Sequence, residues 1–314
     1  MTEKDPPISV SGGGETFAEP RLAAFMAKPS AVNEFVLGDW TLKTVKDRIM
    51  QSTCPHQQHN PTCDVCLFHT FCPLPTLPDM VFAKNLLTLR HKTGARIEFK
   101  ALGALKEVDA TKSDATIKVS ATDEWMASRT DAVDKMKLGR DFDWTFSSKY
   151  KGDLVAITPI ETDERIDLER LKQREPILFY DEMQLYEDEL ADHGCATMSL
   201  RVRCMPSGFF VLQRFYLRVD AVLVRIYDTR VRWCKQRPGH VLREWTCREA
   251  KWHETSQAVR ANCMQPDHCW MHMPVLEETV DKLPVATAAS PKKTTANGLS
   301  APLRPDANQE AASL

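Results

Sequence analysis

The sequence has almost no excess charge and no long apolar run. Its 41 Lys and Arg residues nearly balance 43 Asp and Glu residues, which leaves a formal net charge of −2 over 314 residues. A chain with that balance has no long-range field to attract nucleic acid or an anionic membrane. The longest apolar runs, such as residues 221–224, are far too short to span a bilayer. We therefore expect neither nucleic acid nor a membrane as the partner.

Signatures of catalysis and of export are also missing. The chain has only 12 glycines, and the Gly triplet at residues 12–14 does not lie between a strand and a helix, as a phosphate loop does. There is no nucleophile elbow and no HExxH motif. The first residues show no basic stretch followed by an apolar run, so no secretory signal is expected. These absences favour an intracellular protein that is not an enzyme.

Both ends of the sequence have the composition of disordered tails. Residues 1–33 are rich in Pro, Gly, Ser and charge, and residues 284–314 contain no aromatic residue. Such segments cannot bury enough apolar surface to fold. A single folded domain is therefore predicted over residues 34–283, where hydrophobic residues and all seven tryptophans supply core material.

Alternating apolar and polar residues predict several strands in the second half of the chain. From Met198 to Cys204 every second residue is apolar and the others are Ser or Arg, so one face of this strand is buried and the other is basic. Consecutive strands joined by short turns form antiparallel sheets. The predicted fold class is α+β, with antiparallel β-sheets and a few packed helices. One helix is expected in TDERIDLERLKQRE, with Thr162 or Asp163 as its N-cap.

The densest cluster of metal-binding side chains lies in residues 54–72, CPHQQHNPTCDVCLFHTFC. It holds four cysteines and three histidines in 19 positions. Cys63 and Cys66 have the spacing that lets two thiolates hold one tetrahedral Zn²⁺. Cys54, His56 and His59 lie upstream as possible ligands of a second pair, and His69 and Cys72 follow at intervals of three. The predicted set is Cys54, Cys63, Cys66 and Cys72.

Two interpretations of this segment stay open. One is a structural zinc site, and the other is a Cys/His-rich surface insertion, residues 54–75, that binds no metal. The usual finger and ribbon patterns have a longer loop between their ligand pairs. Five prolines between positions 55 and 78 predict a loop without a long helix. No cofactor other than this zinc is expected.

Six segments in the same order resemble the TOR signalling pathway regulator-like (TIPRL) family. They are DWTFSSKYKG, ERIDLERLKQRE, LYEDELADHG, SLRVRCMPSGFF, RFYLRVDAVLVRIYDTR and LREWTCRE, within a resemblance that covers residues 35 to 250. The resemblance implies an α+β fold and a non-enzymatic, mainly cytoplasmic regulator. Such a protein binds the catalytic subunit of type 2A protein phosphatases and acts in TOR signalling. Residues 54–72 have no counterpart in the family, so they are expected to be a lineage-specific addition. The alternative function, which rests on their cysteines and histidines, is a zinc-binding interaction module built on Cys54–Cys72.

The resemblance also indicates which residues contact the phosphatase. The acidic-then-Ile element of the family matches residues 163–167 and points to Ile166. The strand-end element matches residues 225–230 and points to Ile226 and Asp228. On physical grounds alone Asp228 would cap a turn at the end of a strand, and the resemblance instead favours a contact with the partner. An acidic residue common in the family falls here at Gly103, so that contact is not carried over.

Overall fold

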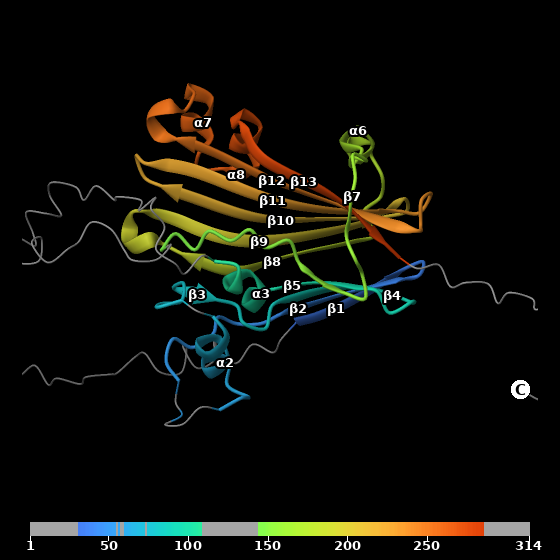
Figure 1. Cartoon of the computed structure of the whole chain (residues 1–314), viewed down its shortest axis with the longest axis horizontal. Helices are drawn as coiled ribbons and strands as arrows, with labels where there is room; N and C mark the ends of the chain where they lie inside the picture. Colours follow the sequence, from blue (N-terminus) through green and yellow to red (C-terminus); the bar gives the residue numbers. More distant parts are fainter. Residues whose placement is uncertain (1–30, 55, 57–59, 73, 109–143, 286–314) are drawn as a thin grey trace, which may run out of the picture.

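Two antiparallel sheets pack face to face and enclose one core (Figure 1). The predicted class, α+β with antiparallel sheets and few helices, is confirmed. Nearly all of the two predicted tails lies outside the residues that the structure describes. The computed structural model describes residues 31–54, 56, 60–72, 74–108 and 144–285.

The smaller sheet has five strands in the order β1-β2-β4-β5-β6. Its first strand begins at residue 31, three residues before the predicted start of the domain. A hairpin turn at Gly38, with a φ of +61°, joins the first two strands. Side chains on the second strand alternate, so that Trp40, Leu42 and Thr44 are buried. The strands are β1 (Ala31–Leu37), β2 (Trp40–Lys46), β4 (Leu86–His91), β5 (Arg96–Lys100) and β6 (Asp153–Val155).

The larger sheet has eight strands in the order β3-β8-β9-β10-β11-β12-β13-β7. Its long central strands are joined by tight turns, as the sequence predicted. At the β9–β10 turn only glycine fits position 208, because a Cβ there would lie 2.0 Å from the carbonyl oxygen of Trp233. The strands are β3 (Met80–Val81), β7 (Ile160–Glu161), β8 (Phe179–Asp188), β9 (Gly194–Met205), β10 (Gly208–Val219), β11 (Leu223–Cys234), β12 (His240–Lys251) and β13 (Val275–Pro284).

Aromatic side chains from both sheets meet in the core. The Trp40 ring of the smaller sheet lies edge-on to Phe209 of the larger sheet, with ring centroids 5.2 Å apart. Phe209 stacks on Trp233 at 5.8 Å. Each such side chain contributes about 1.5–3 kcal/mol through burial, and the edge-on and stacked geometries add to that. The two sheets are therefore held together by a shared aromatic cluster.

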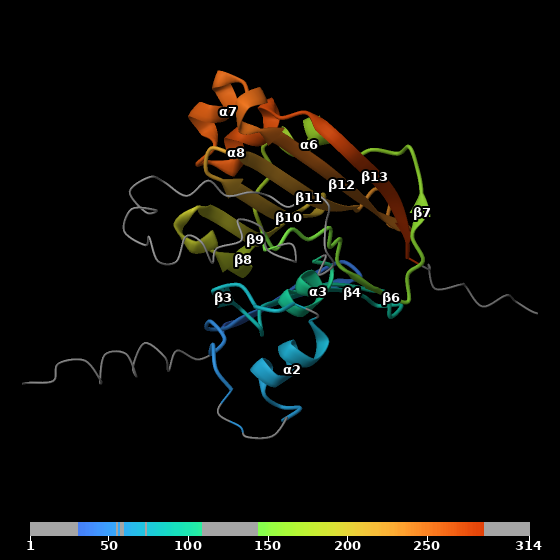
Figure 2. The same cartoon turned by 60° about the vertical axis from the view of Figure 1, so that its left-hand side comes forward.

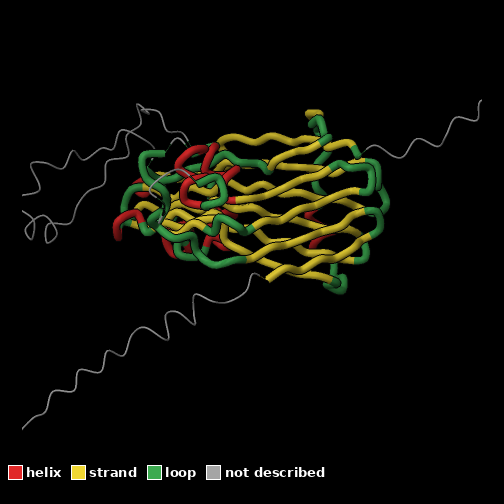
Figure 3. The backbone as a smooth tube through the Cα atoms, turned by 90° about the horizontal axis from the view of Figure 1, so that it is seen from below, coloured by secondary structure: helices red, strands yellow, loops and turns green. Residues whose placement is uncertain are grey.

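The helices are short. The helix at residues 101–106 packs into the main core, and the others lie around the sandwich. Most helical turns gather at one end, while the long strands run side by side (Figure 3). Among the described residues, no helix is long and apolar enough to cross a bilayer. The α-helices are α2 (Asp64–Phe71), α3 (Ala101–Lys106), α6 (Leu168–Lys172), α7 (Gln257–Asn262) and α8 (Pro266–Cys269), and the 3₁₀ turns are η1 (Leu190–Asp192), η2 (Trp252–Glu254) and η3 (Trp270–His272).

Two local predictions were wrong. Helix α6 starts later than expected, because the side chain of Asp167, not of Thr162 or Asp163, accepts a hydrogen bond from the Arg170 N–H at 2.9 Å. The Cys/His segment was predicted to be a loop, yet it contains the eight-residue helix α2. Prolines block a helix only where they interrupt it, and residues 62–72 contain none.

Candidate functional site

The outer face of the larger sheet, which points away from the smaller sheet, carries the residues of interest. Alternation along β11 sends Tyr227 and Val231 into the sandwich core. The same alternation sends Ile226, Asp228 and Arg230 to the outer face. A face built this way presents a fixed row of side chains on a rigid element.

The face is basic, as the β9 pattern predicted. Arginines project from four neighbouring strands and are interrupted by a few carboxylates, among them Asp228 and Glu244. These arginines are Arg201 and Arg203 on β9, Arg214 and Arg218 on β10, Arg230 and Arg232 on β11, and Arg248 on β12.

The structure brings Ile166, Ile226 and Asp228 to this one face but buries all three. Ile226 and Asp228 are 0% and 1% exposed, and Ile166 is 4% exposed. The backbone N–H of Ile166 donates to Glu244 Oε1 at 2.6 Å, which fixes the start of α6 over β12. Ile166 also lines a hollow of about 130 Å³ beside α6. Whether the three residues contact a partner stays a prediction.

A helical cap, residues 255–273, covers Ile226 and Asp228. It joins β12 to β13 and contains α7, α8 and η3, which lie on the outer side of the sheet (Figure 2). Burial raises the pKa of the Cys269 thiol to about 11, so this sulfur acts as an apolar packing group. The cap residues Val259, Cys263, Cys269 and Met273 form a second apolar cluster with Tyr216, Val224 and Ile226 of the sheet.

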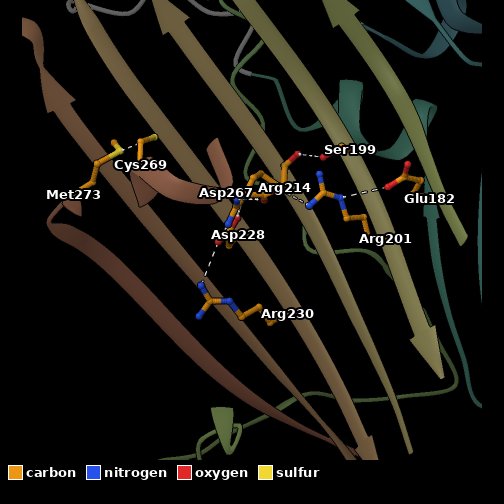
Figure 4. A network of polar contacts seen from close by, with 9 residues as sticks. All are labelled: Glu182, Ser199, Arg201, Arg214, Asp228, Arg230, Asp267, Cys269 and Met273. Atoms are coloured by element: carbon orange, nitrogen blue, oxygen red, sulfur yellow. Dashed lines mark hydrogen bonds and ion pairs between the residues drawn. The ribbon is translucent and has the colours of Figure 1, made fainter. Parts of the chain in front are cut away.

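An ion-pair network ties the cap to the sheet (Figure 4). Arg214 binds Asp228 through two hydrogen bonds of 2.7 Å, from Nε to Oδ1 and from Nη2 to Oδ2. Its Nη1 donates to Asp267 of the cap at 2.7 Å. Arg201 also donates to Asp267, at 2.6 Å, and Arg230 donates to Asp228 at 3.2 Å. Burial raises the pKa of Asp228, but Arg214 and Arg230 outweigh it, so the pKa lies below its usual value.

Trp270 of the cap lies over the same arginines. The guanidinium carbons of Arg230, Arg248 and Arg214 lie 4.9, 5.2 and 5.9 Å from the centre of its ring. Cation–π contacts of this kind contribute about 0.5–2 kcal/mol, with the larger values where water is excluded. The cap is thus held by one shared carboxylate, one indole ring and an apolar cluster.

Position 103, where the resemblance placed an acidic residue of the family, has no room for a side chain. Gly103 lies in α3, and a Cβ there would come within 2.7 Å of the Tyr150 hydroxyl. Tyr150 is itself buried and donates to the Glu98 carbonyl at 3.1 Å. No acidic side chain fits at position 103 unless the Tyr150 ring moves.

The Cys/His segment forms a compact cluster on the opposite side of the molecule from the cap (Figure 2). The ligand atoms of Cys54, His56, Cys63 and Cys66 all lie within 4.8 Å of one another. A backbone hydrogen bond from Cys66 lowers the pKa of the Cys63 thiol to about 7. The backbone of His56 lowers the pKa of Cys54, but the contacts with Cys66 and Cys63 and burial outweigh it and raise that pKa to about 11. Within the described part of the chain, no other group of three or more Cys, His, Asp or Glu residues is this close.

The predicted set of four cysteines needs one correction. Cys72 follows the last residue of α2 and packs in the main core, 4% exposed. It is nine residues from Cys63 along a helix, which is roughly 13 Å. Burial raises the pKa of its thiol to about 11. His56 takes its place beside Cys54, Cys63 and Cys66.

Residues 80–256 match the model of the TIP41-like family. A TIP41-like protein of Caenorhabditis elegans is 42% identical over 255 residues, which cover 80% of this chain and 90% of that protein. A TIP41-like protein of Homo sapiens is 35% identical over 258 residues, 81% of this chain and 90% of that protein. The chain belongs to the TIP41-like family. The resemblance drawn from the six ordered segments is thereby confirmed.

One relative's name carries functional information. The Type 2A phosphatase activator TIP41 of Saccharomyces cerevisiae is 33% identical over 215 residues, which cover 62% of this chain and 57% of that protein. The TIP41-like model covers the central strands of the larger sheet. It begins after the Cys/His cluster and ends just before α7.

Sequence reasoning missed several residues of this TIP41-like face. Arg214 could have been found, because the tight turn between β10 and β11 places it directly opposite Asp228. Asp267 and Trp270 lie in a segment without clear periodicity, so no signal in the sequence connects them with β10 or β11. His56 was one of the possible ligands in the sequence, but the predicted set of four contained Cys72 instead.

Proposed function

We propose that this TIP41-like protein is a non-enzymatic regulator that binds the catalytic subunit of a type 2A protein phosphatase. We propose further that it acts in TOR signalling and in the cytoplasm. Membership of the family and the name of the yeast relative support a role in phosphatase regulation. The resemblance of residues 163–167 and 225–230 to the family's binding elements supports the catalytic subunit as the partner.

The observation that carries this proposal is convergence on one face. Ile166 lies far from Ile226 and Asp228 in sequence, yet all three lie on the outer face of the larger sheet. Around them the face offers arginines, and the cap offers Met264 and Met271, which are 70% and 59% exposed. Arginine and methionine are enriched at protein interfaces, and methionine adapts to the shape of a partner.

Burial divides these residues into two roles. Asp228 and Ile226 are covered by the cap, so in this arrangement they support the interface by holding Arg214 and the cap in place. The residues that contact the phosphatase directly are exposed ones, namely Met264 and Met271 of the cap and Arg201, which is 40% exposed. Ile166 likewise fixes the backbone at the start of α6.

The test is binding between the purified full chain and a purified type 2A catalytic subunit, measured by native mass spectrometry and by calorimetry. A one-to-one complex is expected. Arg201→Glu on the outer face is expected to weaken it at least tenfold, because it reverses a charge within the interface. Arg90→Glu makes the same change on the exposed side of β4 in the smaller sheet and is expected to leave the affinity unchanged.

Two outcomes would contradict the proposal. The absence of any complex would overturn the function itself. Equal weakening by Arg201→Glu and Arg90→Glu would leave the function standing but remove the outer face as its site. Circular dichroism and a denaturation curve for each variant show that the chain is still folded.

A further inference from the structure

We propose that Cys54, His56, Cys63 and Cys66 bind one structural Zn²⁺. This metal holds the loop between β2 and α2, residues 47–63, in place. The site is independent of the outer face, from which it is separated by both sheets (Figure 2). It lies before the part of the chain that matches the TIP41-like model. Zinc binding at this site can therefore be tested independently of phosphatase binding.

The distances within the cluster are close to those of a tetrahedral zinc site. Zn–S bonds of about 2.3 Å and a Zn–N bond of about 2.0 Å place two sulfurs about 3.8 Å apart and a sulfur and a nitrogen about 3.5 Å apart. Cys54 Sγ lies 3.7 Å from Cys63 Sγ and 3.4 Å from His56 Nδ1. It lies 3.2 Å from Cys66 Sγ, so metal binding has to separate this pair by about 0.6 Å. The remaining pairs of ligand atoms lie within 4.8 Å of each other.

The donor set identifies both the metal and its role. Three thiolates and one imidazole in a tetrahedral arrangement form the Cys₃His set of structural zinc sites. Such soft sulfur donors select Zn²⁺ over Mg²⁺ or Ca²⁺, which prefer oxygen. Four protein ligands fill the coordination sphere and leave no open position for a substrate. The site is therefore structural, and it does not make the chain a zinc enzyme.

The surrounding chain explains why a metal is needed here. From Asp47 to Cys63, none of the described residues is buried. One partly buried anchor, Met50, lies at the start of the loop and packs against the main core. The fully buried anchors, such as Phe68 and Cys72, lie in α2 or beyond it. A loop without its own core cannot offset its conformational entropy. A metal that joins Cys54 and His56 to the start of α2 replaces the missing core.

One hydrogen bond has to change when the metal binds. His56 Nε2 lies 3.1 Å from the side-chain nitrogen of Asn60. Zn²⁺ on Nδ1 leaves a proton on Nε2, which then needs an acceptor. Because His56 is exposed, this acceptor is either water or the Asn60 oxygen, once the amide turns towards His56. That oxygen now accepts from the N–H and hydroxyl of Thr62 at 2.9 and 2.7 Å.

The test uses the purified full chain, freed of any histidine tag and titrated with Zn²⁺ alone. Native mass spectrometry is expected to show one Zn²⁺ per chain, and Co²⁺ in its place is expected to give the visible absorption of tetrahedral cobalt thiolate. Cys63→Ser is expected to weaken binding at least a hundredfold. Cys72→Ala and Cys234→Ser, a half-exposed thiol on β11, are expected to bind as the unaltered chain does.

Loop order gives a second readout. Chelation is expected to speed proteolytic cleavage between residues 47 and 63 and to leave the unfolding of the two sheets unchanged. The proposal is overturned if the reduced chain binds no Zn²⁺ at one equivalent. It is equally overturned if Cys72→Ala abolishes binding while Cys63→Ser does not, or if the cysteines are found only as a disulfide.

Discussion

Removing the carboxylate of Asp228 is predicted to destabilise the folded chain by about 3 kcal/mol. Asp228 is 1% exposed and receives two hydrogen bonds of 2.7 Å from Arg214, whose side chain is 6% exposed. Asp228→Ala would leave this guanidinium buried beside a cavity. Breaking a buried pair by removing one partner costs about 3–5 kcal/mol.

The lower end of that range applies here because Arg214 keeps a second carboxylate. Asp267 accepts from it at 2.7 Å but is 47% exposed, so solvent screens the remaining pair. For a domain of about 200 residues, a loss of 3 kcal/mol corresponds to a drop in Tm of about 6–12 °C. Asp267→Ala removes two screened pairs, with Arg214 and with the 40% exposed Arg201, and is expected to cost about 1 kcal/mol.

Guanidinium chloride unfolding followed by tryptophan fluorescence measures both variants. A double variant, Arg214→Met with Asp228→Leu, separates pairing from packing. It is expected to be more stable than Asp228→Leu alone, because the buried Arg214 charge is removed together with its partner. Arg230 loses Asp228 in both variants, so its loss cancels in this comparison. The reasoning is refuted if Asp228→Ala costs less than 1 kcal/mol, or if the double variant is the less stable of the two.

Four further predictions follow from the same contacts. Because Arg214 and Arg230 lower the pKa of Asp228, this carboxylate stabilises the fold above its usual pKa of about 3.9. That stability is lost as the pH falls further, so acid titration should destabilise the unaltered chain more than Asp228→Ala. Gly103→Ala is expected to destabilise the fold by about 1 kcal/mol. Displacing the Tyr150 ring costs about 1–3 kcal/mol, while the gain in helix propensity returns about 1 kcal/mol. A thermal melt in which the Tm is unchanged or raised would contradict this. Asn60→Asp gives the Nε2 proton of His56 a permanent acceptor and is expected to tighten zinc binding about tenfold. A competition titration with a chromophoric chelator measures this affinity, and weaker binding would exclude Nδ1 as the ligand atom. Trp270→Ala is expected to loosen the cap by about 1 kcal/mol, seen as faster hydrogen exchange in residues 255–273, and unchanged exchange would show that the ring does not hold it.

The larger sheet was predictable because its strands carry local information. Alternation from Met198 to Cys204, and the tight turns at Gly194 and Gly208, fix each strand and its neighbour within a few residues. The strand pairs β8 to β12 follow one another in sequence and in space. The start of α6 was less predictable, since Thr162, Asp163 and Asp167 are all good caps. The structure uses Asp167, next to the long-range hydrogen bond from the Ile166 N–H to Glu244.

The candidate site was only partly predictable because its key contacts are distant in sequence. The resemblance pointed to Ile226 and Asp228 but not to their burial. That burial depends on Asp267 and Trp270, which belong to a segment of short helices with no periodic apolar pattern. In the Cys/His segment, spacing identified the pair Cys63 and Cys66. It could not show that α2 carries Cys72 away from them and into the core.

The burial of Asp228 also changes how a loss of phosphatase binding would be interpreted. If the phosphatase contacts Asp228 directly, the cap must first leave, and the measured affinity is reduced by the small fraction of open molecules. Loosening the cap by about 1 kcal/mol through Trp270→Ala would then tighten binding about fivefold. If Asp228 acts only by holding Arg214 and the cap, the same variant weakens binding, because the contact surface around Met271 loses its order. The sign of this one change therefore distinguishes a covered contact from a support, which Asp228→Ala alone cannot do because it also destabilises the fold.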